Sequence, residues 1–321
     1  MSDERVSEYL ESSFLAPLLD KEGITDISYN GESFFYEHNL YGRKKAEIKK
    51  SSKEVGDFLR QIANLSEKQF SYSCPLMDIS FSRYRLNAAF LNLVRVRGEK
   101  SYSFSLRLTK PGCVIDDDSP FFEKDARDFL VQAVLDYRSI IIGGVTSSGK
   151  TELQKYLLSK MRENSRLIII DAGKELEMAR GRDGVDLTSW VVDERFPDSS
   201  FPSLIKNALR NDPDYIVVAE SRGKEMLDAI SSAMSGHPLI MTIHAAELEE
   251  MPSRMARMAM MGEEMLFRSE LMDDIYHNFP IYVHLKKSTD EEGNIFRYLD
   301  SIAVVNPSKD GLERIYQRGQ K

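Results

Sequence analysis

One short segment combines residue types that can surround an anion with backbone groups. Residues 144–151 read GVTSSGKT and match the pattern G-x-x-x-x-G-K-[ST]. Glycines in such a loop let N–H groups close around phosphate oxygens, and the following helix adds positive potential. The lysine of this pattern reaches the β and γ phosphates, and the next hydroxyl ligates Mg²⁺. We therefore predict a site for ATP and Mg²⁺ formed by Gly144, Val145, Thr146, Ser147, Ser148, Gly149, Lys150 and Thr151.

The flanks of this segment support the same interpretation. An apolar strand is expected over residues 139–143, directly before the loop, and a helix is expected from Gly149. Leu153, Leu157 and Met161 recur at a spacing that places them on one face of that helix. The alternative is a chance turn rich in glycine and serine, and the strand before it argues against that alternative.

Two carboxylates end apolar runs that read as buried strands. Asp171 follows the run at residues 167–170, and Glu220 follows the run at 216–219. The carboxyl ends of parallel strands meet at the edge where ligands bind, and a carboxylate there can hold a metal ion or an attacking water. Strand-end acids also serve as helix caps or surface charges. We predict catalytic roles for Glu220, Asp171 and Lys150, and metal ligation by Thr151 and, through water, Glu220.

Two histidines and two arginines complete the set of candidates. His244 closes the apolar strand at residues 239–243, and His237 lies just before that strand. An imidazole at a strand end can hydrogen-bond the γ phosphate and report its loss, although a lone buried histidine is more often a packed one. We predict a catalytic role for His244 and contact with the nucleotide for His237. Arg85 and Arg107 lie on two strands of the first region and, taken alone, are typical of a solvated strand face.

The first of two expected domains covers residues 1–115. Apolar residues at helical spacing predict one helix over 5–20 and another over 53–67. Asn30 and Gly31 stand between two short strand-like runs and predict a hairpin turn. Further strands follow, so this domain reads as α+β.

The second domain is expected over residues 120–321, after the polar run at 116–120. Strands and helices alternate through most of it, which is typical of a doubly wound, mostly parallel sheet. The fold class predicted from this alternation is α/β, with a P-loop domain that follows a smaller α+β domain.

Composition limits the classes of function. The 321 residues include 43 Lys and Arg and 51 Asp and Glu, a net charge of −8, which argues against general binding to nucleic acid. The apolar runs are too short to span a bilayer, and the N-terminus has no charged and apolar regions typical of a secretory signal. We expect a cytoplasmic protein, in which Cys74 and Cys113 are thiols.

A longer pattern extends across residues 209–225. It reads LRNDPD, an apolar strand, and then AESRGKE, and it resembles the traffic ATPases of type IV and type II secretion, whose pattern is L-R-x-x-P-D, an apolar strand and G-E-x-R-x-x-E. The resemblance continues through Gly236 and His237 and through residues 242–245, which look like the histidine box of that family. Residues 170–176 look like its aspartate box. The resemblance covers most of the chain.

The resemblance implies a homohexameric ring in which the N-terminal domain covers a nucleotide held by a RecA-like P-loop domain. Arg85 and Arg107 fall where the family places arginines that reach the phosphates. Glu220 matches the Walker B acid, and Asp171 stands where a glutamate usually positions water. Glu175 and Arg222 match further residues of the boxes.

The function that the resemblance implies is Mg²⁺-dependent hydrolysis of ATP to power a type IV secretion or conjugation machine. Its partners would be inner-membrane components of a secretion or pilus machine, and the protein would lie peripherally at the cytoplasmic face of the membrane. The absence of a zinc-binding cysteine cluster and of the pilus-retraction signature A-I-R-N-L-I-R-E favours the type IV branch.

Two other functions stay open. One is a ring ATPase that translocates DNA, against which the net charge of −8 argues. The other is a nucleotide-gated scaffold with vestigial hydrolysis. The aspartate box favours the second alternative, because it begins with Asp171 and Ala172 where the family usually has Glu-Asp.

Overall fold

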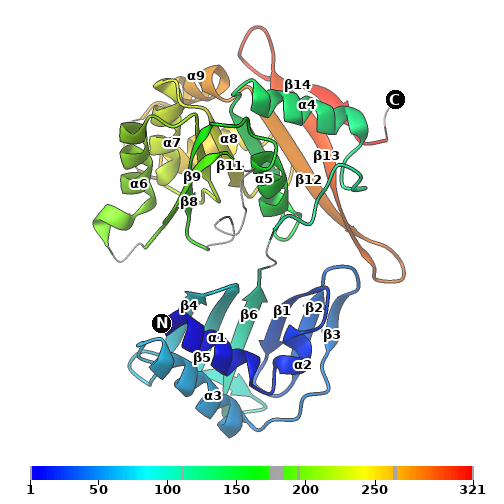
Figure 1. Ribbon diagram of the computed structural model, residues 1–321, viewed down its shortest axis with the longest axis vertical. Coiled ribbons are helices and arrows are strands. Elements are labelled where there is room, and N and C mark those ends of the chain that lie inside the picture. The colour runs from blue at the N-terminus through cyan, green and yellow to red at the C-terminus, as the bar shows by residue number, and fades with distance from the viewer. Residues whose placement is uncertain are drawn as a thin grey trace. The chain divides into compact units, whose positions relative to one another are not determined.

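The chain forms two compact units in the computed structural model, which describes residues 2–109, 112–173, 176, 184–193, 196–262 and 266–319 (Figure 1). The N-terminal unit comprises Met1–Lys110 and Thr289–Phe296, and the C-terminal unit comprises Pro111–Ser288 and Arg297–Lys321. The structure therefore adds a short segment from late in the chain to the N-terminal unit. No helix among the described residues is both long enough and apolar enough to cross a membrane.

The N-terminal unit is an antiparallel sheet of six strands in the order β3-β2-β1-β6-β5-β4, with helices α1 and α3 packed against it (Figure 1). Its strands are β1 (Ile24–Tyr29), β2 (Phe34–His38), β3 (Gly42–Lys45), β4 (Leu76–Phe81), β5 (Tyr84–Val96) and β6 (Glu99–Leu108). Its helices are α1 (Ser2–Glu11), α2 (Ala16–Leu19) and α3 (Ser52–Leu65).

Local sequence explains most of these elements. Asn30 accepts the N–H groups of Glu32 and Ser33, so the predicted hairpin turn is confirmed. The single helix predicted over residues 5–20 is wrong, because α1 and α2 are separate helices. Ser13 accepts the N–H of Leu15 between them, and a proline occupies the first turn of α2, where its missing N–H costs nothing.

The C-terminal unit is built on an eight-stranded sheet in the order β14-β13-β12-β7-β11-β10-β8-β9. In the part of the sheet that runs from β12 through β7, β11, β10 and β8 to β9, neighbouring strands are parallel, as predicted. Strands β13 and β14 pair antiparallel. Its strands are β7 (Ile140–Gly144), β8 (Arg166–Asp171), β9 (Asp186–Val191), β10 (Tyr215–Val218), β11 (Leu239–Ile243), β12 (Ile281–Thr289), β13 (Ile295–Val305) and β14 (Leu312–Gln317).

Helices cover both faces of this sheet (Figure 1). Alternate residues along β7 show the division, because Ile141 packs with α6 to α9 on one face while Ile140 and Ile142 pack with α4 and α5 on the other. The helices are α4 (Lys124–Leu135), α5 (Lys150–Leu158), α6 (Phe201–Ala208), α7 (Glu225–Met234), α8 (Met251–Ala259) and α9 (Arg268–Asn278). This is the doubly wound plan that the alternation of elements predicts.

Candidate functional site

The phosphate-binding segment forms a tight turn between β7 and α5. Gly149 caps α5 with a left-handed φ of 100°, which favours glycine. A Cβ atom on Gly144 would lie 2.5 Å from Ser148 Oγ and 2.7 Å from the Leu285 carbonyl oxygen. Only glycine fits there, so both glycines of the pattern have a structural reason.

Lys150 lies over the start of this loop. Its side chain is buried, and Nζ donates hydrogen bonds of 3.0 Å to the carbonyl oxygens of Gly144 and Val145. Nζ is also 3.4 Å from Nδ1 of His244, at the end of β11. The lysine therefore connects the loop to the neighbouring strand end.

The loop fits the phosphate groups of a nucleotide. Ser148 is fully buried, and its Oγ finds no hydrogen-bond partner among the described residues. A buried hydroxyl without a partner is costly, and a phosphate oxygen would satisfy it. Lys150 supplies a positive charge beside it, and Thr151 follows in the first turn of α5. These are the donors and the charge that an anionic ligand requires.

Glu220 and His244 meet at the carboxyl ends of β10 and β11. Oε1 of Glu220 is 2.6 Å from Nε2 of His244, and Oε2 is 2.6 Å from Nη2 of Arg222. Two bonds hold the strand ends in register: Thr242 Oγ1 donates to the Ala219 carbonyl, and the Ser221 N–H donates to the Thr242 carbonyl. The acid and the imidazole are thus positioned by the parallel sheet.

Opposing effects set the charges in this pair. Burial raises the pKa of Glu220, but the hydrogen bond and charge of Arg222, with the charges of His244 and Lys150, outweigh it and leave the pKa lowered. Burial and the charge of Lys150 lower the pKa of His244, although Glu220 acts to raise it. Glu220 is therefore ionised and His244 neutral at pH 7.

The neutral imidazole defines a chain of contacts. We assign its proton to Nε2, because Nε2 faces a carboxylate oxygen of Glu220 that can only accept. Nδ1 then carries the lone pair that faces the ammonium group of Lys150. The contacts run from Arg222 through Glu220 and His244 to Lys150 and end at the phosphate-binding loop.

Asp171 is buried at the end of β8, where its carboxylate caps the loop that follows. Oδ1 accepts the N–H of Gly173 at 2.7 Å, and Oδ2 accepts the N–H of Leu176 at 2.8 Å. This geometry matches the capping alternative, while the catalytic role stays a prediction. Glu175 lies outside the described residues.

His237 is not brought to this cluster. Lys150, Glu220 and His244 lie at the carboxyl ends of their strands or just beyond them, whereas His237 precedes the amino end of β11. A strand of five residues separates the two ends by about 16 Å. The geometry therefore does not support contact of His237 with phosphates bound at the loop of the same chain.

Arg85 and Arg107 belong to the N-terminal unit, where they face each other across β5 and β6. Arg85 pairs with Asp78 at 3.1 Å, and Arg107 pairs with Asp26 at 3.2 Å. Both arginine side chains are more than one third exposed. The solvated strand face is therefore observed, and contact with a nucleotide stays a prediction.

Three residues near the loop were not predicted from the sequence. Gln154 is buried in α5 and donates to the carbonyl of Val218, the last residue of β10. Arg254, on α8, contributes to the lowered pKa of His244, and its buried Nε has no hydrogen-bond partner among the described residues. Arg297, on β13, donates to the carbonyl of Ser147. No motif marks these residues, because each acts from a separate element.

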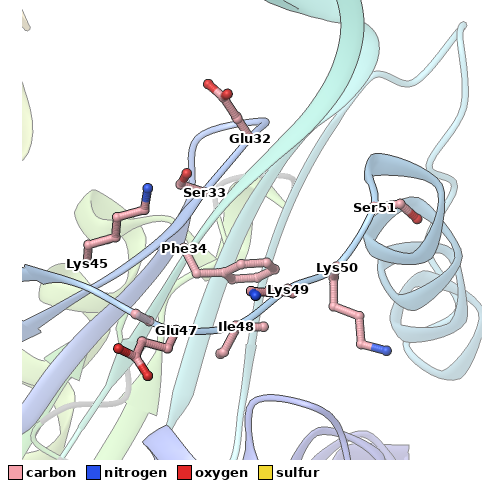
Figure 2. A pocket seen from close by; sticks show the side chains of 10 residues that line it. Glu32, Ser33, Phe34, Lys45, Glu47, Ile48, Lys49, Lys50 and Ser51 are labelled. Carbon is pink, nitrogen blue, oxygen red and sulfur yellow. The ribbon is translucent and has the colours of Figure 1, made fainter.

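None of these residues lines a hollow on the N-terminal unit. Figure 2 shows its lining, in which basic side chains are prominent. The residues that line it are Glu32, Ser33, Phe34, Lys45, Ala46, Glu47, Ile48, Lys49, Lys50 and Ser51. None of them was predicted as a site residue.

The doubly wound sheet and the loop between β7 and α5 define a P-loop protein. The profile of the family described as type II/IV secretion system protein matches residues 98–273. The chain belongs to this family.

Relatives agree with this assignment. An uncharacterized protein of Bacillus anthracis is 29% identical over 98% of this chain and 72% of its own length. The type IV secretion system protein VirB11 of Bartonella quintana is 36% identical over 39% of this chain and 35% of its own length. A putative conjugal transfer protein of Mycobacterium tuberculosis is 23% identical over 96% of this chain and 88% of its own length.

Solved structures share the fold. The Legionella pneumophila ATPase DotB aligns with a TM-score of 0.66 at 22% identity, over 97% of this chain and 83% of that one. The VirB11 ATPase from the Brucella suis type IV secretion system, in complex with sulphate, aligns with a TM-score of 0.51 at 23% identity, over 96% of each chain. The predicted fold class, a RecA-like P-loop domain with a smaller α+β domain, is confirmed.

Proposed function

We propose that this protein hydrolyses ATP with Mg²⁺ to power a type IV secretion or conjugation machine. It would act as a homohexamer at the cytoplasmic face of the inner membrane, bound to membrane components of that machine. The observation that carries the enzymatic part is the chain of contacts from the phosphate-binding loop through Lys150 and His244 to Glu220. This arrangement puts an ammonium group and an ionised carboxylate on two sides of one imidazole.

The residues would divide the chemistry as follows. The backbone of the loop and Lys150 bind the phosphates, and Thr151 and Glu220 would hold Mg²⁺, which neutralises charge on the transferring phosphate. Glu220 is ionised at neutral pH and can orient an attacking water as well. The 3.4 Å contact between Lys150 and His244 is longer than the two bonds of Lys150 to the loop. It is the contact that a phosphate oxygen would replace most easily.

The relatives support the transport role. VirB11 of Bartonella quintana matches over 135 residues and is described as a type IV secretion system protein. A match over nearly the whole chain is described as a putative conjugal transfer protein. We therefore place the chain in the type IV branch, and we propose Arg85 and Arg107 as further ligands of the phosphates.

A nucleotide-gated scaffold is the second candidate, and Asp171 favours it. Both oxygens of this carboxylate accept backbone N–H groups, and the following residue is Ala172 rather than a second acid. If no other group orients water, ATP would bind without being cleaved. Binding of ATP with no phosphate released over hours would support this candidate.

Phosphate release from Mg-ATP by the purified chain tests the proposal. Lys150→Ala should abolish turnover, whereas Glu220→Gln should leave ATP bound but uncleaved. Lys206→Ala is the matched control, because Lys206 is an exposed lysine of the same unit that pairs with Asp228. Hydrolysis by Lys150→Ala at the parent rate would show that the assignment of the site is wrong.

A further inference from the structure

Strand β3 lies at one end of the N-terminal sheet and pairs only with β2 in the described part of the chain (Figure 1). Neighbouring residues of a strand direct their N–H and C=O groups to opposite edges. The N–H of Ala46 donates to the carbonyl of Phe34, so the backbone of Lys44, two residues earlier, also faces β2. The backbone groups of Arg43 and Lys45 therefore face the outer edge of the sheet.

The beginning of this outer edge is covered, and its end is open. The carbonyl of Leu40 accepts the N–H of Ile295 just before β3, and a Cβ atom on Gly42 would lie 3.5 Å from that isoleucine. From Arg43 to Lys45, no backbone hydrogen bond to the outer edge occurs among the residues that the structure describes. The hollow that Figure 2 shows, with a volume of about 1050 Å³, is lined by the last residue of β3 and the six residues that follow it. The open edge thus leads to a space that can admit side chains of a partner.

Basic side chains follow the open edge. Residues 43–50 read RKKAEIKK, with five basic residues and one acidic residue. Lys50 pairs with Glu54 at 2.9 Å. Lys45 and Lys49 are exposed and form no ion pair with any other described residue. The edge therefore carries positive charge that the fold itself does not neutralise.

One acidic segment of the same unit lies near the beginning of β3 and is engaged elsewhere. The turn at residues 290–292 precedes Gly293, whose carbonyl oxygen is 3.7 Å from the Cβ position of Gly42. Asp290 accepts both the N–H and the side-chain amide of Asn294. No ion pair joins this turn to the basic residues of the edge within the described ranges, so their charge is left for a partner.

Charged residues on an edge strand commonly protect a protein against aggregation. Two copies of β3 that met edge to edge would oppose like charges, which is destabilising. This protective role accounts for residues 43–45. It does not account for Lys49, which lies beyond the strand, or for the hollow. The same charges stabilise a neighbouring strand of opposite sign.

We propose that the outer edge of β3 binds an extended acidic segment of another protein as an added strand. Hydrogen bonds to the backbone of Arg43 and Lys45 supply affinity that does not depend on the partner's side chains. Acidic side chains of the partner lie beside the basic residues of the edge and supply selectivity, and the hollow receives the side chains at the end of the segment. The inference goes beyond the proposed function, because it requires no nucleotide.

The probe is a fluorescein-labelled peptide of sequence TEVEEEVET, which reads the same from both ends and so serves either strand direction. Fluorescence anisotropy with the full chain at about 0.15 M salt should show binding. The peptide should slow hydrogen exchange at Arg43 and Lys45 but not at Lys44, whose N–H already faces β2. The same peptide methylated at the backbone nitrogens of its three central glutamates keeps its charge, and it should bind about tenfold more weakly because it cannot donate to the edge.

Substitutions of one residue separate the contribution of charge from that of the backbone. Lys45→Glu reverses a charge at the edge and should weaken binding about tenfold. Lys45→Ala removes only the charge, whereas Lys45→Pro also removes the outward N–H and should bind more weakly than Lys45→Ala. Proline is tolerated on an edge strand where the N–H faces outward. Lys100→Glu is the matched control, because Lys100 is an exposed lysine of β6, three strands from β3, and this variant should bind as the parent does.

The proposal is overturned if the peptide does not bind the parent, if the methylated peptide binds as tightly as the unmodified one, or if Lys45→Glu keeps the parental affinity. Tighter binding of a short oligothymidylate than of the peptide would also overturn it and would assign the edge to nucleic acid. If Lys45→Pro does not fold, Lys45→Ala and the methylated peptide decide. None of these measurements uses ATP, so phosphate release tests the proposed function separately.

Discussion

Nε2 of His244 lies 2.6 Å from Oε1 of Glu220, across the adjacent ends of two parallel strands. Two hydrogen bonds between the same strand ends hold this distance, from Thr242 to Ala219 and from Ser221 to Thr242. The opposite side of the imidazole faces Lys150. The ammonium group of Lys150 and the carboxylate of Glu220 therefore both act on the pKa of His244.

Replacement of Lys150 by Met should raise the pKa of His244. The ammonium group is the largest of the charges that lower this pKa, and Met keeps the length of the side chain. The measurement is an NMR titration of the His244 imidazole. Arg254→Met should raise the pKa less, because the charge of Arg254 has the smallest effect among those on His244. An unchanged pKa in Lys150→Met would contradict the contact that we describe.

The same lowered pKa has a consequence for stability. The pKa of His244 in the folded protein lies below its ordinary value of 6.5, so between those values the unfolded chain binds more protons. The free energy of unfolding should therefore rise with pH in that window and lose this contribution as pH falls through it. Denaturant titrations of the parent and of His244→Gln should show a shallower pH dependence in the variant.

Substitution of Gly149 by Ala should cost about 1–2 kcal/mol of stability, because its left-handed φ of 100° is unfavourable for alanine. Nucleotide binding should fall as well, since this glycine closes the phosphate-binding loop. Gly236→Ala is the control: its φ is 90°, and no atom lies within 4 Å of the new Cβ. It should lose somewhat less stability, because a Cβ on Gly149 would also lie 3.0 Å from Cε2 of Phe121, and it should bind nucleotide normally. Equal losses of binding in both variants would assign the effect to instability alone.

The two roles open to Asp171 can be separated by two substitutions. Asp171→Ala leaves the N–H groups of the half-buried Gly173 and the buried Leu176 without acceptors and should cost about 1–3 kcal/mol. Asp171→Asn keeps an acceptor for one of these N–H groups but turns its amide NH₂ toward the other, so it should lose less stability than Asp171→Ala. If the carboxylate positions water, the Asn variant should still lose about 100-fold in the rate of phosphate release. A parental rate in this variant would leave capping as the only role.

Strong local signals made much of the fold predictable. The apolar runs that became β7, β8, β10 and β11 are buried on both faces of a parallel sheet, so each is apolar throughout and easily recognised. The sequence did not predict β9, because among the described residues it pairs only with β8 at the edge of the sheet and is partly exposed, so its residues carry a weaker pattern. The helix predicted over residues 5–20 failed because apolar spacing does not report a break between two short helices that bury the same face.

The candidate site also has a part that local sequence patterns predict and a part that they do not. Lys150, Glu220 and His244 follow apolar strands in sequence, and the rule that parallel strands end at one edge brings them together. That rule also places His237 at the other edge, because it precedes its strand. Contact of His237 with the nucleotide stays a prediction, which the direction of this strand does not favour.

By itself, the sequence determined the loop, the strands that flank it and the acids that end them, because each depends on neighbours within a few residues. Only the tertiary structure decided which side chains hold that loop. Arg297 is 150 residues from Ser147, and Glu152 is 38 residues from Val114. Contacts at such separations depend on how the sheet is ordered and where the hairpin of β12 and β13 folds back, and no local pattern of residues encodes either.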